Sequence, residues 1–316
     1  MYPDLELKEK VVHGTTKNPI TALHFTAGPG TPYPEYFFVG RHWHPYVEIL
    51  LIKKGSYLFE INLENHVLKE GDICILNSEE LHQITGQSRE AAHEVLLFDP
   101  QILGFSYQDE WQEQEIEPFL SHRAVLKNFL RPKEPGYQEI RQLLEQVMEA
   151  ADGVNQSRRR ELEEGRKEEH RSGQYIRCKL LLLDLFYRMT DKGLLLPKDA
   201  LHSASDMWKI SRYKTIISYI EGHYQEPVSL RQMADAIPCN SQYLCRFFKE
   251  IAGVSPIQYL IAYRIQRSCG LLASTSRPIL EIALDCGFEN ISYFIRKFKE
   301  LKGCTPREFR KRQQAT

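Results

Sequence analysis

Four side chains between residues 42 and 82 have the types and the spacing needed to meet around one ligand. His42 and His44 stand two positions apart, so on a β-strand they would point to the same face. Glu48 keeps the same parity if the strand continues past Pro45, and a neighbouring strand could deliver His82. Three imidazoles and one carboxylate form a donor set that zinc, iron, manganese or nickel accepts.

Two further interpretations of these four residues stay open. They could form hydrogen bonds to an organic ligand, or they could satisfy one another as a buried polar network. We expect a ligand pocket and keep a divalent metal cofactor as a separate hypothesis. Nearby aromatic residues, Tyr33 and Phe38 among them, suit stacking on a sugar ring, although aromatic strand residues also commonly belong to the core. The ligand-binding residues that we predict are His42, Trp43, His44, Tyr46, Glu48 and His82.

A second group of candidate residues lies in an internal repeat near the C-terminus. The segments NSQYLCRFFKEIAGVSP, from Asn240, and NISYFIRKFKELKGCTP, from Asn290, match at an offset of fifty residues. The asparagine that opens each copy can cap a helix, and the glycine in each copy, Gly253 or Gly303, can end that helix in the left-handed conformation. Each copy therefore predicts one helix.

The outward face of each predicted helix suits DNA. Arginine can bind guanine with two hydrogen bonds, glutamine suits adenine, and an apolar side chain can meet a thymine methyl group. The residues predicted to contact bases are Gln242, Cys245, Arg246, Ser292, Ile295 and Arg296. Those predicted to contact phosphates are Asn240, Lys249, Asn290, Lys297, Lys299, Lys302, Arg307 and Arg310. For Cys245 and Ile295, an ordinary place on a partly exposed helix is an equally good interpretation.

A shorter helix precedes each copy, SLRQMADAI at 229–237 and PILEIALDC at 278–286. Ala234 and Ala283 are small enough for two helices to approach closely. Two short helices joined by a tight turn predict a helix-turn-helix motif, so we expect motifs at 229–251 and 278–301. A long helix from Pro256 to Ala273 would join them.

About a third of the chain, from Tyr213 to Arg312, resembles the DNA-binding domain of the AraC/XylS family of bacterial transcription regulators. The residues that carry the resemblance are Gly287-Phe288, Ser292-Tyr293-Phe294, Arg296, Phe298-Lys299, Gly303, Thr305-Pro306 and Phe309. The resemblance implies that both second helices enter successive major grooves on one side of the duplex. One chain would then do what a dimer of simple repressors does.

The region from Ile20 to about Pro100 has short β-rich segments separated by Gly, Pro and Asn, which predict a small antiparallel barrel or sandwich. Residues Gly40 to His44, Glu48, Gly55, Gly71-Asp72 and His82 are similar to the two cupin motifs. Asn77 and Glu79 stand where the second motif usually has proline and glycine. This region looks like the cupin-type sensor barrel that many AraC-family regulators carry.

We expect no strands after Phe98. Apolar stripes predict helices at 136–150 and 174–189, which can cover one face of the barrel. The resemblance implies that this pair forms a homodimer interface; the alternative is that it only completes the monomer core. The charged segment 156–171 has nearly balanced signs, so we interpret it as a solvated loop or a helix extension.

Charge divides the chain into two parts. The net charge of the 316 residues is −1, but residues 211–316 carry +7 and residues 1–210 carry −8. We predict an α+β multidomain protein: a cupin-like barrel with its helical pair at 1–195, a linker at 196–210, and an all-α DNA-binding domain at 211–316. Seven cysteines without a CxxC pair, and no apolar leader or membrane-length segment, favour a reduced cytoplasm.

These observations predict a sequence-specific transcription regulator, not an enzyme, that binds promoter DNA and responds to a small effector, with a carbohydrate favoured. RNA polymerase would be a partner if the protein activates transcription. Two alternatives stay open. One is a metal-dependent cupin enzyme fused to a DNA-binding domain, and the other is an assembly module that DNA binding merely localises.

Overall fold

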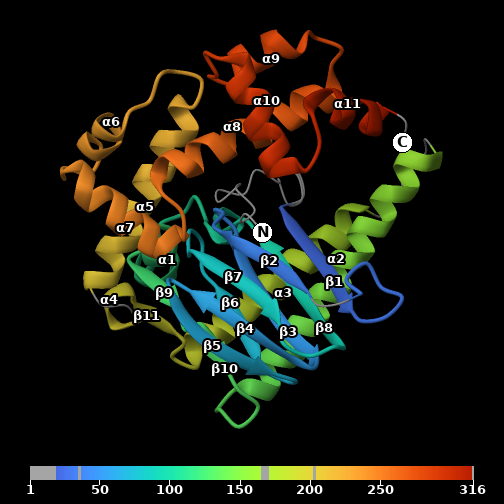
Figure 1. Cartoon of the computed structure of the whole chain (residues 1–316). Helices are drawn as coiled ribbons and strands as arrows, with labels where there is room; N and C mark the ends of the chain where they lie inside the picture. Colours follow the sequence, from blue (N-terminus) through green and yellow to red (C-terminus); the bar gives the residue numbers. More distant parts are fainter. Residues whose placement is uncertain (1–18, 35–36, 165–170, 202–203, 315–316) are drawn as a thin grey trace. The chain divides into compact units, whose positions relative to one another are not determined.

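The computed structural model describes residues 19–34, 37–164, 171–201 and 204–314 (Figure 1). They divide into two units, one ending at Ala204 and the other beginning at Ser205. Within these ranges, no helix combines the length and the apolar character needed to cross a membrane.

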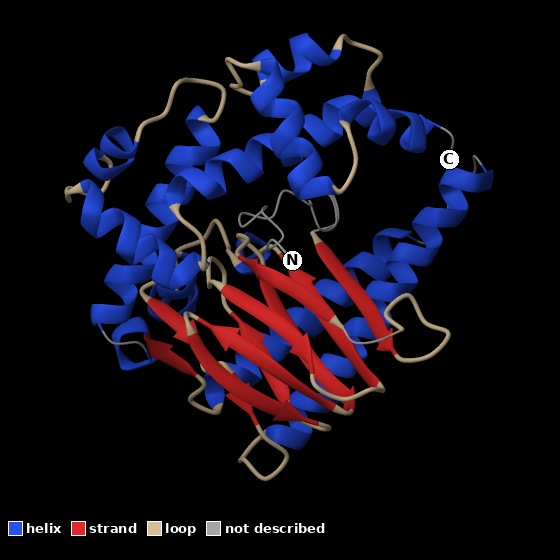
Figure 2. Cartoon of the chain, in the orientation of Figure 1, coloured by secondary structure: helices blue, strands red, loops and turns tan. Residues whose placement is uncertain are grey.

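Most strands of the N-terminal unit form two antiparallel sheets (Figure 2). The larger sheet has the order β1-β8-β3-β6-β10, and the smaller has the order β2-β7-β4-β5. Their bounds are β1 Ile20–Ala27, β2 Phe38–His42, β3 Val47–Lys54, β4 Ser56–Ile61, β5 Glu64–Lys69, β6 Ile73–Leu76, β7 His82–Gly86, β8 Ala91–Phe98 and β10 Phe129–Leu130. This arrangement agrees with the small antiparallel barrel predicted for residues 20–100.

Strand β3 shows how the sequence positions two cores. Its side chains alternate, so that Val47 and Ile49 join one apolar core while Leu50 and Ile52 join another. The first core lies between the larger sheet and the helices, and the second lies among the strands of the barrel. A strand covered on both faces requires such a continuous apolar run.

Two long helices cover the outer face of the larger sheet: α2, Tyr137–Glu164, and α3, Arg171–Asp191. Ile140, Leu144 and Val147 of α2 are fully buried against the sheet, and Leu182 and Phe186 of α3 complete this core. The prediction of two helices is confirmed, although both extend beyond their predicted ends. Residues 156–164 of the charged segment belong to α2, while 165–170 lie outside the described residues.

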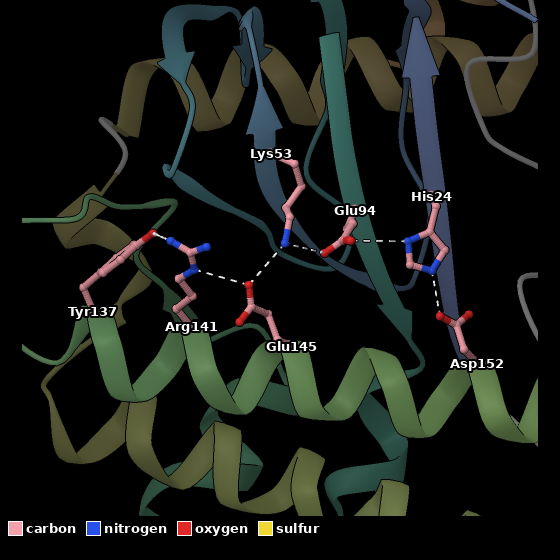
Figure 3. Close-up of polar contacts among 7 residues, drawn as sticks. All are labelled: His24, Lys53, Glu94, Tyr137, Arg141, Glu145 and Asp152. Atoms are coloured by element: carbon pink, nitrogen blue, oxygen red, sulfur yellow. Dashed lines mark hydrogen bonds and ion pairs between the residues drawn. The ribbon is translucent and has the colours of Figure 1, made fainter. Parts of the chain in front are cut away.

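A line of polar contacts also joins α2 to the sheet (Figure 3). The Lys53 ammonium lies 3.2 Å from Glu145 of α2 and 3.4 Å from Glu94 of β8. Nε2 of His24 lies 2.7 Å from Asp152. These contacts lie between partly exposed side chains, outside the apolar core.

The prediction of no strands after Phe98 is wrong. Besides β10, which pairs with β6, the short strands β9 (Ala124–Leu126) and β11 (Leu195–Pro197) pair with each other. Segments of two or three residues are too short to show strand periodicity, and their partners are distant in sequence. Short helical segments lie between β8 and β9: η1 Pro100–Leu103, η2 Gln112–Ile116 and α1 Glu117–Leu120.

The segment that we predicted as a linker, 196–210, is largely helical where it is described. It contains α4 (Lys198–Leu201) and the first turns of α5 (Ala204–His223). Proline and serine are also common at helix N-termini, so the same residues mark a helix start as well as a loop.

Every secondary-structure element of the C-terminal unit is a helix among its described residues. Its remaining helices are α6 Leu230–Asp235, α7 Ser241–Ala252, α8 Pro256–Ser274, α9 Ile279–Asp285, α10 Ile291–Lys302 and α11 Pro306–Gln314. Both predicted helix pairs and the joining helix are therefore confirmed. Helix α8 lies between the pairs and packs against both α7 and α10 (Figure 1).

Candidate functional site

Helix α7 carries the first group of predicted DNA contacts. The Asn240 side chain accepts a hydrogen bond from the Tyr243 N–H at 2.8 Å, and Gly253 ends the helix with a φ of 72°. Both predicted caps are confirmed. Phe247 and Phe248 lie on the buried side. The other side is exposed at Gln242, Arg246 and Lys249 and partly exposed at Cys245.

Helix α10 repeats this arrangement. Asn290 accepts a hydrogen bond from the Tyr293 N–H at 2.9 Å, and Gly303 has a φ of 70°. The exposed face consists of Ser292, Ile295, Arg296, Lys299 and Glu300. The Arg296 guanidinium lies 5.2 Å from the centroid of the Tyr293 ring, a cation–π contact that restrains it over the first turn.

Several of the predicted phosphate-binding residues have polar neighbours within the domain. The Lys297 ammonium lies 2.8 Å from Glu300, and Lys302 donates a hydrogen bond to Gln266 of α8 at 2.7 Å. Arg310 donates to the Arg277 carbonyl oxygen at 2.6 Å. Exposed contacts of this kind contribute about 1 kcal/mol or less, so a DNA phosphate can replace the internal partner.

Arg264, to which we assigned no role from the sequence, binds the segment that follows α5, and the turn between α9 and α10 packs against the same place. Arg264 of α8 donates hydrogen bonds to the carbonyl oxygens of Tyr224 and Glu226, each at 2.7 Å. Gly287, with a φ of 81°, packs so closely that a Cβ there would lie 2.3 Å from the Tyr224 oxygen. Burial lowers the pKa of Arg264. The only feature of the sequence that could have indicated this structural role of Arg264 is its position within the apolar run LIAYRI.

In the N-terminal unit, four of the six predicted pocket residues, His42, His44, Glu48 and His82, come together from three separate segments. His42 ends β2 and is paired across the sheet with His82 of β7. Strand β2 does not continue past Pro45, which has no backbone N–H for strand pairing. Glu48 therefore reaches the cluster from β3 and not by the parity that we expected.

The side chains of His42, His44, Glu48 and His82, here called the His/Glu cluster, lie close together. Nε2 of His44 lies 3.2 Å from Oε2 of Glu48, and Nε2 of His82 lies 3.7 Å from the same oxygen. The rings of His42 and His82 have centroids 4.2 Å apart. His44 and His82 are almost completely buried, at 2% and 1% exposure, and Glu48 is 8% exposed.

A small cavity of about 90 Å³ adjoins the His/Glu cluster inside the barrel. Its lining is mainly apolar, and its polar residues are His42, Glu48 and His93. Of the six predicted ligand-binding residues, only His42 and Glu48 line this cavity, and Trp43, His44, Tyr46 and His82 do not. Trp43 is buried, and the ring of Tyr46 lies 5.9 Å from that of His44. The volume equals that of about three water molecules.

His93 is a cavity residue that the sequence reasoning missed. Its Nδ1 lies 2.8 Å from the Tyr57 hydroxyl, and its ring stacks on Phe25 with centroids 5.0 Å apart. Burial lowers the pKa of His93 to about 4. No motif includes it, and only its alternation with Val95 and Leu97 on β8 could have indicated an inward position.

The two departures from the second cupin motif have structural roles. Glu79 adopts a φ of 66°, the left-handed region that the motif's glycine would favour. Asn77 is buried and binds both the N–H and the carbonyl oxygen of Leu126 through its side-chain amide. Its backbone N–H donates to buried Glu80, which also accepts a hydrogen bond from Asn128. This network connects the motif to β9.

Comparisons with known proteins match both units. A family described as an AraC-like ligand binding domain matches residues 27–184, and one described as a helix-turn-helix domain matches residues 233–312. The chain is 26% identical over 309 residues to the uncharacterized HTH-type transcriptional regulator YdeC of Bacillus subtilis (strain 168), over 98% of this chain and 97% of that one.

Two further relatives have similar coverage. The HTH-type transcriptional activator RhaS of Enterobacter sp. (strain 638) is 24% identical over 91% of each chain. The arabinose operon regulatory protein of Salmonella typhimurium (strain LT2) is 25% identical over 81% of this chain and 80% of that one.

Proposed function

Because this chain belongs to the AraC family of DNA-binding transcription regulators, we propose that it controls a specific promoter in response to a carbohydrate bound in its N-terminal barrel. The observation that carries the proposal is the pair of similar helices, α7 and α10, each with an arginine on an exposed face. The sensor would occupy residues 1–195 and the DNA reader residues 211–316.

Base recognition is assigned to the exposed residues of these two helices. Arg246 and Arg296 would bind guanine, while Gln242 would bind adenine and Ile295 would contact a thymine methyl group. Cys245 and Ser292 complete the base-contacting set. Asn240, Lys249, Asn290, Lys297, Lys299 and Lys302 would contact phosphates and set the register of the protein on the duplex.

A carbohydrate effector is supported by one relative, whose name is arabinose operon regulatory protein. The cavity of about 90 Å³ is smaller than the roughly 300 Å³ typical of a pocket for a drug-sized ligand. A sugar therefore requires the side chains around His42 and Phe37 to move apart. Such a movement gives the effector different affinities for two states, which is what a switch requires.

Helix α3 supports the proposal of a homodimer. Ile176, Leu180 and Tyr187 are 54%, 61% and 46% exposed, and their spacing of four and seven residues places them on one stripe of the helix. The stripe lies opposite the buried face that carries Leu182 and Phe186. A second copy of the same helix would cover it, as in a helical-pair dimer with two-fold symmetry.

The experiment that tests this function is selection of binding sites from a random duplex library with the full chain, followed by footprinting. We expect two protected blocks about one helical turn apart and a strong decrease in affinity with salt. A selection without an enriched sequence would contradict the assignment.

Thermal shift with a panel of sugars then tests the effector, and sugars that leave the melting temperature unchanged would reject it.

We also propose that the barrel senses and does not catalyse, because all three relatives are named as regulators or activators. RNA polymerase is a partner if the protein activates transcription. Transcription in vitro from the selected promoter, with and without the chain, decides this: a rise supports contact with polymerase, and a fall assigns repression.

A further inference from the structure

Helix α8 joins two helix-turn-helix motifs, the first formed by α6 and α7 and the second by α9 and α10. Near its start, the Tyr259 ring lies 5.6 Å from the Phe248 ring of α7, centroid to centroid. Further along, Ile265 and Leu272 belong to the apolar core that contains side chains of α9 and α10. Arg264 lies between these two parts of α8, so it stands where the two motifs meet.

The Arg264 guanidinium contacts segments that belong to different motifs. The segment after α5 leads into the first motif, and its carbonyl oxygens at Tyr224 and Glu226 each accept a hydrogen bond from Arg264 at 2.7 Å. The turn of the second motif packs beside the same guanidinium. The central carbon of the guanidinium lies 5.8 Å from the centroid of the Phe288 ring, and a Cβ at Gly287 would lie 2.9 Å from Nε and from Nη2.

A further hydrogen bond joins the same two segments. The side-chain amide of Gln225 donates to the carbonyl oxygen of Asp285, the last residue of α9, at 2.9 Å. The backbones are also close, because a Cβ at Gly287 would lie 2.3 Å from the Tyr224 oxygen. The two motifs are therefore joined by direct contacts in addition to α8.

The hydrogen-bond geometry at this junction suits arginine and not lysine. Nε and Nη2 of a planar guanidinium can donate to two oxygens at once, whereas a lysine ammonium is a point charge on a flexible stem. We propose that Arg264 is a positioning residue that holds α7 and α10 at one separation and one relative orientation. The chain would then accept only one spacing between its two half-sites, the stretches of DNA that each motif contacts.

Such positioning matters only if α7 and α10 both contact DNA, as in the proposed function. One base pair inserted between the half-sites moves them apart by about 3.4 Å and rotates one relative to the other by about 35°. A rigid pair of motifs cannot follow this change without losing base contacts in one groove. Motifs joined by α8 alone could follow it by bending or twisting of the helix.

The test uses the full chain and the duplex sequence that it enriches from a random library. Gel-shift titrations compare this duplex with others in which one or two base pairs are inserted or removed between the half-sites. For the wild type, we expect a change of one base pair to weaken binding by about tenfold or more, because base contacts are lost.

For Arg264→Lys and Arg264→Ala, we expect this spacing penalty to fall to about threefold or less. Base preferences within each half-site should stay those of the wild type, which duplexes with one scrambled half-site measure. Arg264→Lys keeps the positive charge, so its salt dependence should also be unchanged. A relaxed spacing with unchanged base preferences is a result that a general loss of stability would not give.

Arg277→Ala is the matched control, because Arg277 forms its ion pairs with Glu281 and Asp285 inside the second motif. It should keep the spacing penalty of the wild type. Arg264 variants that also keep this penalty overturn the proposal, whether or not they bind more weakly. A wild type that tolerates every spacing overturns it as well.

Circular dichroism checks that each variant folds. If neither Arg264 variant folds, Gln225→Ala replaces them, because Gln225 is exposed and its truncation removes only the hydrogen bond to Asp285. It should reduce the spacing penalty, and an unchanged penalty rejects the direct contact as the cause. Enrichment of no sequence by the wild type would reject the proposed DNA contacts and this role of Arg264 with them. Two half-sites at freely variable spacing would reject the role of Arg264 alone.

Discussion

Arg246 and Arg296 occupy equivalent positions in α7 and α10, and both are exposed. A packing role would require at least part of each side chain to be buried in the helical core. Their neighbours at one turn, Lys249 and Lys299, are exposed as well, so each helix presents a basic strip. On such a strip, arginine can contact base edges while the neighbouring lysine contacts a phosphate.

We predict that Arg246→Ala and Arg296→Ala each reduce the binding free energy by about 1–3 kcal/mol, with the loss concentrated at particular base pairs. The reason is that a bidentate contact to guanine discriminates among bases. Gel-shift titrations with singly substituted duplexes measure this effect. Lys302→Ala is the control: it should weaken all duplexes alike and reduce the salt dependence. An Arg296→Ala variant with unchanged base preferences would refute the assignment.

His93 makes the stability of the barrel depend on pH. Burial lowers the pKa of His93 from 6.5 to about 4, so the unfolded chain takes up a proton between these values and the folded chain does not. Stability from the neutral ring is therefore present above about pH 6.5 and is lost as the pH falls toward 4.

At about pH 5 the loss relative to about pH 7 should be on the order of 2 kcal/mol for the wild type. His93→Gln should remove this part of the slope, whatever its effect on stability at neutral pH. Urea unfolding of both proteins at the two pH values measures the difference. Parallel pH profiles would show that folding does not lower the pKa of His93.

Among the elements, the turn between α9 and α10 depends most sharply on one residue. Gly287 combines a positive φ with the close approach of the Tyr224 carbonyl oxygen, whereas Gly253 has a positive φ but no atom within 4 Å of an added Cβ. A substitution at Gly253 therefore tests only the need for a positive φ, whereas one at Gly287 also tests the lack of space for a Cβ.

We predict that Gly253→Ala destabilises the C-terminal unit by about 1–2 kcal/mol, the cost of a left-handed alanine. Gly287→Ala should cost more, because the Tyr224 oxygen or Arg264 must also move. Thermal unfolding followed by circular dichroism measures both. Equal shifts in melting temperature would mean that the turn relaxes without cost.

Apolar burial, and not the ion pairs of Figure 3, should hold α2 to the sheet. Leu144 is completely buried, whereas Glu145 has a side chain that is 39% exposed. We predict that Leu144→Ala costs about 2–5 kcal/mol and that Glu145→Gln costs less than about 1 kcal/mol. Urea unfolding at low and high salt tests this ranking, and a larger loss for Glu145→Gln would reverse it.

On the scale of the whole chain, the division of charge agrees with the two units. Residues 211–316 carry +7 and hold the exposed basic strips, while residues 1–210 carry −8. The net charge therefore favours contact of DNA with residues 211–316 over contact with residues 1–210.

We predict that Leu180→Glu converts a dimer to a monomer, since it places a charge in the centre of the exposed apolar stripe of α3. Sedimentation equilibrium measures the molecular mass. Arg177→Glu introduces the same residue at a neighbouring exposed position outside the stripe and should leave the dimer intact. A wild type that sediments as a monomer at micromolar concentration would contradict the dimer proposal.

The sequence by itself determined the helical reader. Capping by Asn240 and Asn290, termination at Gly253 and Gly303, and the apolar stripes all act over three to five residues, so they can be recognised without knowing the fold. Because the two copies match at an offset of fifty residues, the same capping and apolar pattern predicts a helix in each copy.

Only the tertiary structure decided how the four residues His42, His44, Glu48 and His82 are brought together. Strand β2 ends at His42, and strand β3 begins only at Val47. Glu48 therefore does not lie on the same strand as the histidines. It reaches them because β2 pairs with β7 and β3 pairs with its own neighbours. The inward position of His93 and the exposed stripe of α3 also depend on which distant segments cover which faces. Strand pairing is set by contacts far apart in sequence, and for that reason local pattern could identify the His/Glu residues but not their geometry.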